Sequence, residues 1–483
     1  MLRPMLYALC MLSLIACDDT ADADPEEQPD GATDLSDAGP DTLSDAAPDA
    51  DAPDGAMALP CAVWFNGEAA PLDTLEVGAG SRIALQVESA DGVERGIPLV
   101  PPGWSLGGHP EANWGLVAPY TPVEPDPVLR WPVRCPDGTE FMLEQPLTLR
   151  PLTWSRTFLW LEGDDGPLAR EYFSMWINPT NTDELLLYGG FHYVPQQFTV
   201  GDDLWLRDLV SGRWQRTETP MLTPATGGGG LALIPGEASA LYFGGLRTEA
   251  GGSQIPGALY RLDYADEPHT WTPLEPLGLP ESGSYQPAFF YDTPRDRYLA
   301  VGGQRLNGTH MDVSRFFLPE MSWGSAEVAE GEAPTGRTGF FWAHDPETER
   351  LFVFSGEQGG APNCDCDQET WALELAETPM RWVKLRLDDP PEGRRNGAYA
   401  LDPVGHRLFV WGGTPDGMNA SEGVFALHLG RNEERWVRVP IEGEAPPPRA
   451  SGAMVFDGAR SRMLMGFGNS TAGVFADLWS LGL

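Results

Sequence analysis

Lysine is almost absent from this chain of 483 residues. Lys384 is the only one, and the 31 basic residues stand against 71 acidic ones, which gives a formal net charge of −40. A surface this acidic repels phosphate backbones and anionic lipid headgroups. The composition therefore argues against a nucleic-acid partner and against binding to a membrane through a basic patch.

The chain also lacks the sequence signatures of several enzyme classes. It contains no Gly-x-Ser-x-Gly elbow and no His-Glu-x-x-His pair, and its seven histidines are not clustered. The glycine run 227–230 leads into a predicted strand rather than a helix, so it does not fit a phosphate-binding loop. No segment after residue 16 approaches the roughly 18 apolar residues that a membrane-spanning helix needs. We predict no cofactor and no metal site.

The first 16 residues combine one charge, Arg3, with an apolar stretch that ends in Leu14-Ile15-Ala16-Cys17. This pattern resembles a bacterial lipoprotein signal peptide spanning residues 1–16. The resemblance implies cleavage before Cys17, lipidation of that cysteine and anchoring in the bacterial cell envelope, at the outer membrane or the cell surface. An ordinary secretory signal with a chance cysteine is the alternative, and the choice of membrane stays open.

The segment after the predicted lipid anchor is strongly acidic. Residues 18–56 hold 14 acidic residues and no lysine or arginine. Such a segment cannot bury enough apolar surface to fold, and its charges repel one another. We therefore predict a disordered acidic tether over residues 17–57. Without these 14 carboxylates and Arg3, the net charge of residues 57–483 is −27.

Two cysteines bracket a strand-rich segment that precedes the rest of the chain. The alternating run 82–87 and the sequence Trp131-Pro132-Val133-Arg134-Cys135 are typical of strands. The segment 58–151 resembles a bacterial immunoglobulin-like β-sandwich. A Cys61–Cys135 disulfide, which an oxidising compartment permits, would stabilise it by about 3–5 kcal/mol.

The rest of the chain is organised by a repeat. Six short apolar runs end at a glycine or a glycine pair, and the second glycine positions are 55, 58, 53, 57 and 55 residues apart. A constant period of this length indicates stacked copies of one unit, here a strand-rich propeller blade. The six second positions are Gly190, Gly245, Gly303, Gly356, Gly413 and Gly468.

A tryptophan series runs out of phase with these glycines. Trp154 precedes the first glycine run, and the last glycine run has no tryptophan strand of its own, only the segment 475–481. Pairing the Trp154 strand with that segment would complete the sixth copy and remove two open sheet edges. The series is Trp154, Trp214, Trp271, Trp323, Trp382 and Trp436.

The repeated unit resembles the kelch repeat. After the glycine pair come a strand such as Asp203-Leu204-Trp205-Leu206 and the stretch from Asp208 to Trp214. The resemblance covers residues 152–483 and departs where Ser355 and Phe467 replace the first glycine. It implies an all-β fold, a six-bladed kelch-type β-propeller closed by an N-terminal outer strand and preceded by the small β-sandwich. Most kelch propellers bind proteins or glycans, whereas galactose oxidase and the bacterial sialate mutarotases are enzymes.

Four arginines recur where the chain is expected to lead into the innermost strand, beside the central channel. Together they would form an anion-attracting mouth at one end of the central channel. Alternatively, each would pair with a carboxylate or carbonyl of a neighbouring blade and so hold adjacent blades together. His192 and His310 lie on loops of the same face. The candidate ligand-binding residues are therefore Arg170, Arg337, Arg394, Arg449, His192 and His310.

The pair Cys364 and Cys366 lies in a tight loop of the fourth copy. We predict a local disulfide between them, because a metal site would need two further Cys or His ligands at a suitable spacing. Galactose oxidase chemistry needs a cysteine crosslinked to a tyrosine, and these two cysteines are the only ones in the propeller, which argues against that enzyme.

We predict an envelope-anchored recognition protein. It would bind a protein or glycan ligand through the face of the propeller that carries the loops after the glycine pairs. Its contact with the membrane would be through the lipid anchor only. A carbohydrate-active enzyme of the mutarotase or oxidase type and a purely structural envelope component are the alternatives. The fold alone does not choose among them.

Overall fold

The computed structural model describes residues 59, 61, 63–65, 68–69, 73–85, 87–89, 92–107, 114–159, 165–194, 197–217, 226–249, 252–278, 283–359 and 366–483. The chain divides at Leu59, where the second of two units, Leu59–Leu483, begins. All described residues belong to the second unit. The predicted signal peptide, Cys17, the acidic tether and Cys364 lie outside them.

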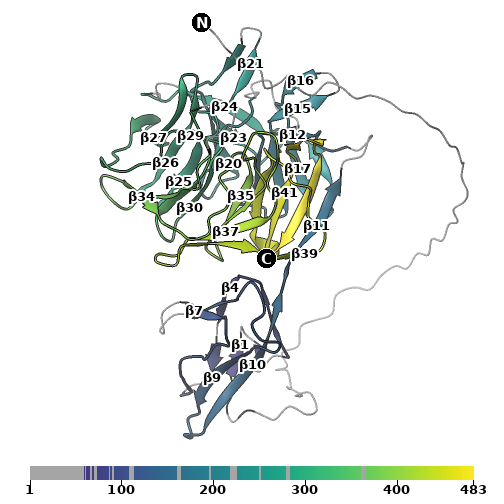
Figure 1. Ribbon diagram of the computed structural model, residues 1–483, viewed down its shortest axis with the longest axis vertical. Coiled ribbons are helices and arrows are strands. Elements are labelled where there is room, and N and C mark those ends of the chain that lie inside the picture. The colour runs from purple at the N-terminus through teal and green to yellow at the C-terminus, as the bar shows by residue number, and fades with distance from the viewer. Residues whose placement is uncertain are drawn as a thin grey trace, which may run out of the picture. The chain divides into compact units, whose positions relative to one another are not determined.

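The described chain is all-β (Figure 1). Apart from the strands it forms two single 3-10 turns, η1 (Thr293–Arg295) and η2 (Gly458–Arg460). Within the described ranges, no helix has the length and apolar character needed to cross a membrane.

Residues 59–150 form three small sheets, with strand orders β2-β1-β5, β3-β10-β9-β6 and β4-β8-β7. Cys61 and Cys135 are joined by a disulfide with a Cα–Cα distance of 5.8 Å, as predicted. A hydrophobic core that includes Leu116 and Trp131 fills this segment. The strands are β1 (Val63–Phe65), β2 (Glu68–Ala69), β3 (Leu75–Gly78), β4 (Arg82–Leu85), β5 (Val87–Ser89), β6 (Glu94–Arg95), β7 (Ser105–Gly107), β8 (Trp114–Val117), β9 (Val128–Arg134) and β10 (Glu140–Arg150).

Five antiparallel sheets of four strands follow, which we number I to V, and in each the spatial order of the strands follows the chain. Sheet I contains β13 (Ser174–Ile177), β14 (Glu184–Tyr188), β17 (Leu204–Asp208) and β18 (Trp214–Arg216). Sheet II contains β19 (Gly230–Leu233), β20 (Ser239–Phe243), β23 (Leu259–Asp263) and β24 (Thr270–Leu274). Sheet III contains β25 (Ala288–Asp292), β26 (Arg297–Arg305), β27 (Gly308–Phe317) and β28 (Ser322–Ser325). Sheet IV contains β30 (Phe341–Asp345), β31 (Arg350–Phe354), β33 (Thr370–Glu374) and β34 (Arg381–Leu385). Sheet V contains β35 (Ala398–Asp402), β36 (Arg407–Trp411), β37 (Val424–His428) and β38 (Arg435–Val439).

Sheet VI is built from both ends of the repeat region, in the order β39-β11-β44-β41-β40. β11 (Leu152–Leu159) pairs antiparallel with β44 (Asp477–Gly482), and Trp154 lies opposite Leu481. The pairing predicted between the Trp154 strand and the C-terminal segment is therefore present. The remaining strands are β39 (Ile441–Glu442), β40 (Ala453–Asp457) and β41 (Arg462–Gly466).

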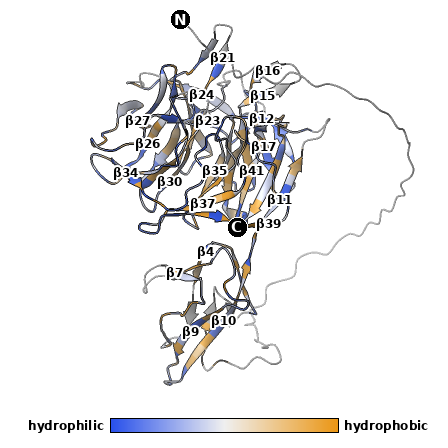
Figure 2. Ribbon diagram, in the orientation of Figure 1, coloured by the Kyte–Doolittle hydropathy of each residue, from blue (hydrophilic) through white to orange (hydrophobic). Residues whose placement is uncertain are grey.

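The apolar runs become the second strands of the sheets, and in β20, β31 and β36 every residue is buried. The strand centres are accordingly hydrophobic in Figure 2. The glycine pair ends each run because the backbone there turns to positive φ. At Gly190, where φ is +90°, an added Cβ would lie 2.6 Å from the carbonyl oxygen of Glu171. Ser355 and Phe467 occupy the first glycine position at φ values of +54° and +57°, so that position tolerates a side chain.

Short strands continue beyond the glycine pairs, at the end of each sheet that we call the loop face. We call the segments that lead into the inner strands the lead-in segments. Residues that follow the glycine pairs form β-bridges with these lead-in segments, so the two lie side by side. The strands of the lead-in segments are β12 (Arg170–Glu171) and β29 (Arg337–Thr338). The strands after the glycine pairs are β15 (Phe191–Val194), β16 (Gln197–Val200), β21 (Arg247–Glu249), β22 (Gly252–Gln254), β32 (Glu357–Gln358), β42 (Asn469–Ser470) and β43 (Gly473–Val474).

Candidate ligand-binding mouth

One residue in each lead-in segment has a left-handed backbone, with φ between +55° and +66°. Backbone hydrogen bonds join every neighbouring pair of these positions except Gln286 and Gly339. For example, Gly228 N–H donates to Tyr172 O (2.6 Å) and Gln286 N–H to Gly228 O (2.7 Å). The first sheet is joined to the last, because Tyr172 N–H donates to Ser451 O at 3.1 Å. We call this set the ring positions: Tyr172, Gly228, Gln286, Gly339, Asn396 and Ser451.

Large side chains at alternate ring positions meet one another. Gln286 Nε2 donates to Asn396 Oδ1 (3.0 Å), and Asn396 Nδ2 donates to Tyr172 Oη (3.0 Å). The positions between them carry Gly228, Gly339 and Ser451. An added Cβ at Gly339 would lie 2.2 Å from Asn396 Oδ1, so a side chain there would break the network. Sheets I, III and V thus supply a hydrogen-bonded polar plug, and the small residues of the other sheets make room for it.

Charged groups surround this plug. Arg395, which follows Arg394, forms an ion pair with Glu357, and the two side chains are only 17% and 11% exposed. Asn469 Nδ2 donates to Glu171 Oε2. The Nε of Arg395 is buried and has no hydrogen-bond partner within the described part of the chain. Arg395 therefore keeps one unused donor. We call Glu171, Tyr285, Glu357, Arg395 and Asn469 the mouth residues.

The local electrostatics keep two neighbouring phenols neutral, that of the ring position Tyr172 and that of the mouth residue Tyr285. Burial, and then the negative charge of Glu171, raise the pKa of Tyr172, and the positive charge of Arg395 only partly opposes this. Burial, together with Tyr172 and Glu171, raises the pKa of Tyr285 well above its usual value. The two rings lie 5.8 Å apart between centroids. These tyrosines can accordingly donate and accept hydrogen bonds near neutral pH, but they are poor candidates for a general base.

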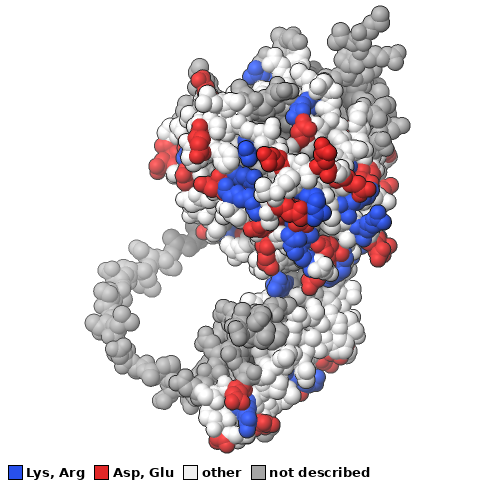
Figure 3. Space-filling view, turned by 90° about the vertical axis from the view of Figure 1, so that its left-hand side faces the viewer, with Lys and Arg blue, Asp and Glu red and all other residues white. Residues whose placement is uncertain are grey.

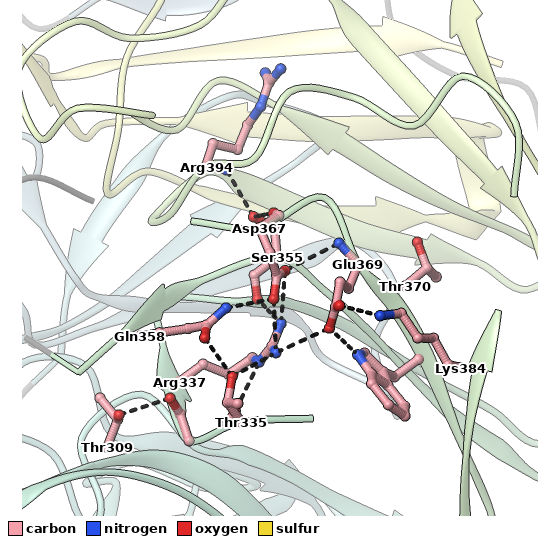
Figure 4. A network of polar contacts seen from close by, with 12 residues as sticks. Thr309, Thr335, Arg337, Ser355, Gln358, Asp367, Glu369, Thr370, Lys384 and Arg394 are labelled. Atoms are coloured by element: carbon pink, nitrogen blue, oxygen red, sulfur yellow. Dashed lines mark hydrogen bonds and ion pairs between the residues drawn. The ribbon is translucent and has the colours of Figure 1, made fainter. Parts of the chain in front are cut away.

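Three of the four predicted arginines are held within their own sheets. Arg170 donates to both carboxylate oxygens of Asp203 (3.0 and 2.9 Å), and Arg337 to both of Asp367 (3.1 and 3.1 Å, Figure 4). Arg449 makes the same two bonds to Asp477. All three arginines are at most 1% exposed. Their charge is therefore compensated inside the sheet, while the ligand-binding role remains a prediction.

Arg394 differs from the other three. Its Nε donates to Glu392 O (2.8 Å), and its Nη1 reaches Gly412 O at 3.4 Å. Its guanidinium lies 5.4 Å from the centroid of the Phe425 ring and points away from Asp367 (Figure 4). In the ranges that the structure covers, Arg394 makes no ion pair with a carboxylate. Burial accordingly lowers its pKa.

The two predicted histidines also pack within their own sheets. His192 Nε2 lies 3.4 Å from Asp203 Oδ1, so it joins the Arg170 pair. His310 Nε2 lies 3.1 Å from Ser284 Oγ. Burial, and then the charge of Arg305, lower the pKa of His310 to about 4, so it is neutral at physiological pH. Their predicted role in ligand binding is likewise not tested by these contacts.

Cys366 is disulfide-bonded, and its predicted partner Cys364 lies outside the described residues. No group of three or more His, Cys, Asp or Glu side chains suited to a metal ion occurs among the residues with described positions. Sequence reasoning missed Arg395 and the ring positions. Arg395 follows the recurring Arg394 but has no equivalent in the other copies. Comparison of the copies therefore does not identify it as a candidate.

The repeated four-stranded sheets and the sequence comparisons both indicate kelch-type repeats in the C-terminal part of the chain. Residues 292–483 match the family described as KLHDC2/KLHL20/DRC7 Kelch-repeats domain. The chain is 25% identical over 271 residues to the mouse protein Multiple epidermal growth factor-like domains protein 8, covering 52% of this chain and 9% of that one. It is 27% identical over 210 residues to the bovine Rab9 effector protein with kelch motifs, covering 41% of this chain and 53% of that one.

The chain thus spans about half, or much less, of the length of these two relatives. Among solved structures, that titled "Structure of YjhT" aligns at a TM-score of 0.47 and 15% identity, covering 65% of this chain and 95% of the other.

Proposed function

We propose that sheets I to VI are the blades of a closed six-bladed propeller whose loop face recognises a protein ligand. Closure is supported by the β11–β44 pairing and by the backbone hydrogen bond from Tyr172 to Ser451, which join the first and last parts of the repeat region. In this arrangement the polar plug fills the centre, and the mouth residues form the floor of a shallow binding surface. Recognition of partners is also the usual role of kelch propellers.

The observation that carries the binding proposal is the chemistry of the loop face. The loops after the glycine pairs expose two large apolar side chains, Leu306 at 74% and Met418 at 70%. Leu306 lies between β26 and β27, and Gln304 of β26 bridges to the half-buried Tyr285. Met418 follows Gly417, where a built Cβ would lie 2.8 Å from Nη2 of the half-buried Arg395. Protein interfaces combine exposed apolar groups with arginine and tyrosine in this way. Figure 3 shows that acidic and basic side chains are interspersed over one side of the molecule, so no single charge dominates that side.

Substitution of both exposed rim residues tests this proposal. We expect Leu306→Glu with Met418→Glu to reduce capture of a partner from envelope extract at least about tenfold, because charges would be buried in the interface. Val210 is the matched control: it is 74% exposed, but it lies in the turn between β17 and β18, at the opposite end of its sheet. Capture that survives the double substitution, or that is lost equally in Val210→Glu, would contradict the proposal. A parallel glycan array distinguishes a glycan ligand from a protein.

We further propose that residues 1–16 are a lipoprotein signal, that lipidated Cys17 anchors the chain in the envelope through the tether of residues 17–57, and that residues 58–151 are an immunoglobulin-like sandwich. Replacing Cys17 by serine is expected to abolish incorporation of labelled palmitate and to move the protein from the membrane to the soluble fraction, because the acyl chains provide the membrane affinity. Cys10→Ser is the control and should change neither. Membrane association that persists in Cys17→Ser would rule out this anchor.

A further inference from the structure

Sheets I and VI share a buried charge pair on the loop face. In each, an arginine of the lead-in segment binds an aspartate that immediately precedes or begins the third strand, as in Arg170 with Asp203 and Arg449 with Asp477. A tryptophan two residues later donates its Nε1–H to the same carboxylate, at 2.6 Å from Trp205 and 2.8 Å from Trp479. The carboxylate thus has one cation and one neutral donor around it.

Sheet V keeps the arginine but has lost the carboxylate. Backbone hydrogen bonds align the three sheets, because Gly201 N–H donates to Gly190 O, Phe475 N–H to Gly468 O and Ser421 N–H to Gly413 O. Two residues after each of these donors stand Asp203, Asp477 and, in sheet V, Gly423. Phe425 stands where the other two sheets have a tryptophan, so the indole donor is absent too.

This loss leaves the Arg394 guanidinium poorly compensated. The residue is only 2% exposed, its Nη1 contact to Gly412 O is long at 3.4 Å, and the face of Phe425 is the remaining partner on that side. A buried cation without a counterion is costly, whereas a carboxylate at hydrogen-bonding distance would offset that cost. Glu422, the adjacent residue, is exposed to solvent.

A second unused donor points to the same place. The Oγ of Ser421 is buried and has no hydrogen-bond partner within the described segments. Ser421 occupies the position of Gly201, where a built Cβ would lie 2.4 Å from His192 Nε2 and 3.1 Å from Asp203 Oδ1. The side chain of Ser421 is therefore directed toward the place where the His192 ring meets the aspartate carboxylate in sheet I.

A Cβ built on Gly423 would lie 3.4 Å from Arg438 Nε and 3.5 Å from Phe425 Cε2, so a small group fits at this position beside a second cation. The carboxylates that fill it in sheets I and VI keep 10% and 7% of their side-chain surface exposed on the loop face, although their arginines are fully buried. An anion could consequently reach the vacated position without unfolding the sheet. It would meet the planar fork of a guanidinium, which matches the two oxygens of a carboxylate.

We propose that sheet V contains a binding site for a small carboxylate of the size of acetate, held by the Arg394 guanidinium and the Ser421 hydroxyl in the place of the missing aspartate. The site lies beyond the proposed recognition of a protein on the loop face and does not depend on it. The bound carboxylate would fix the loop 414–423, which carries Met418, through Ser421.

Acetate is the probe for the test. Saturation-transfer NMR of the acetate methyl group with the full chain is expected to give a saturable signal, with a dissociation constant on the order of 1 mM for so small a ligand. We expect Arg394→Gln to raise that constant at least about tenfold, as expected for loss of a charge-assisted bidentate contact. Ser421→Ala should weaken binding less. Arg435→Gln removes the same charge from an exposed position and should leave the constant unchanged.

A built-in carboxylate provides a second test that does not rely on loss of binding alone. Ser421→Asp places a carboxylate beside Arg394, so it is expected to raise the melting temperature and to abolish the acetate signal. The proposal is overturned if the wild-type protein gives no saturable signal, if Arg394→Gln binds acetate as well as Arg435→Gln, or if a crystal structure grown in acetate shows only water between Arg394 and Ser421.

Discussion

Replacing Asp477 by alanine is expected to lower the free energy of unfolding by about 3–5 kcal/mol, the usual cost of leaving one partner of a buried ion pair uncompensated. Asp477 accepts hydrogen bonds from both terminal nitrogens of Arg449 and from Trp479 Nε1. Arg449 is 1% exposed, so the substitution leaves a buried guanidinium without its counterion. Guanidinium chloride unfolding followed by circular dichroism measures the loss.

The matched control is the equivalent arginine of sheet V. Arg394→Leu removes a buried guanidinium that has no carboxylate partner, so we expect it to cost less than about 1 kcal/mol or to stabilise the protein, because hydrophobic replacement of poorly paired buried ions is often neutral or favourable. The experiment is done without acetate or other carboxylate buffers. Losses of equal size for Asp477→Ala and Arg394→Leu would show that the pairing does not determine the energetics of these arginines.

For these charge pairs, the sequence predicts the arginines but not their carboxylate partners. The recurrence of the four arginines predicts either an anion-attracting mouth or pairing with a neighbouring blade, whereas three of them pair with a carboxylate of their own copy. The signal for the actual partners was also present, because Asp203 and Asp477 each precede a tryptophan by two residues in copies that keep the arginine. The fifth copy, with Gly423 and Phe425, lacks both the carboxylate and the tryptophan. Comparing which residue types are lost together across the copies would have indicated Asp203 and Asp477, but not Asp367, which stands four residues before Trp371.

The ring positions could not have been found in the same way. They are defined by a left-handed backbone, and the six residues share no chemical type, from Tyr172 and Gln286 to Gly339. Tyrosine and glutamine seldom adopt positive φ, so no residue preference identifies them. Their convergence depends on the curvature that brings six separate lead-in segments together, which single-copy patterns do not encode. The disulfide Cys61–Cys135 and the strand pairing of Trp154 were predictable because each joins only two segments.

The Trp154 strand gives the second large expected effect. Trp154→Ala is expected to lower the free energy of unfolding by about 3–5 kcal/mol, the range for removing a buried aromatic side chain from a core. Trp154 is 6% exposed and packs edge-on against Trp411 of sheet V, with ring centroids 6.2 Å apart. The substitution should therefore shift the denaturant midpoint of the whole propeller and not merely that of its N-terminal strand.

Trp382 makes this prediction specific, because it is the member of the same series in the outer strand of sheet IV and is 5% exposed. If β11 serves as the outer strand of the sixth blade, Trp382→Ala and Trp154→Ala should cost the same within about 1 kcal/mol, since both leave the same kind of cavity between blades. If instead β11 packs against sheets that are stable without it, Trp154→Ala would release only this strand. In that case Trp154→Ala would leave the midpoint unchanged while Trp382→Ala lowered it, and the closed ring would be wrong.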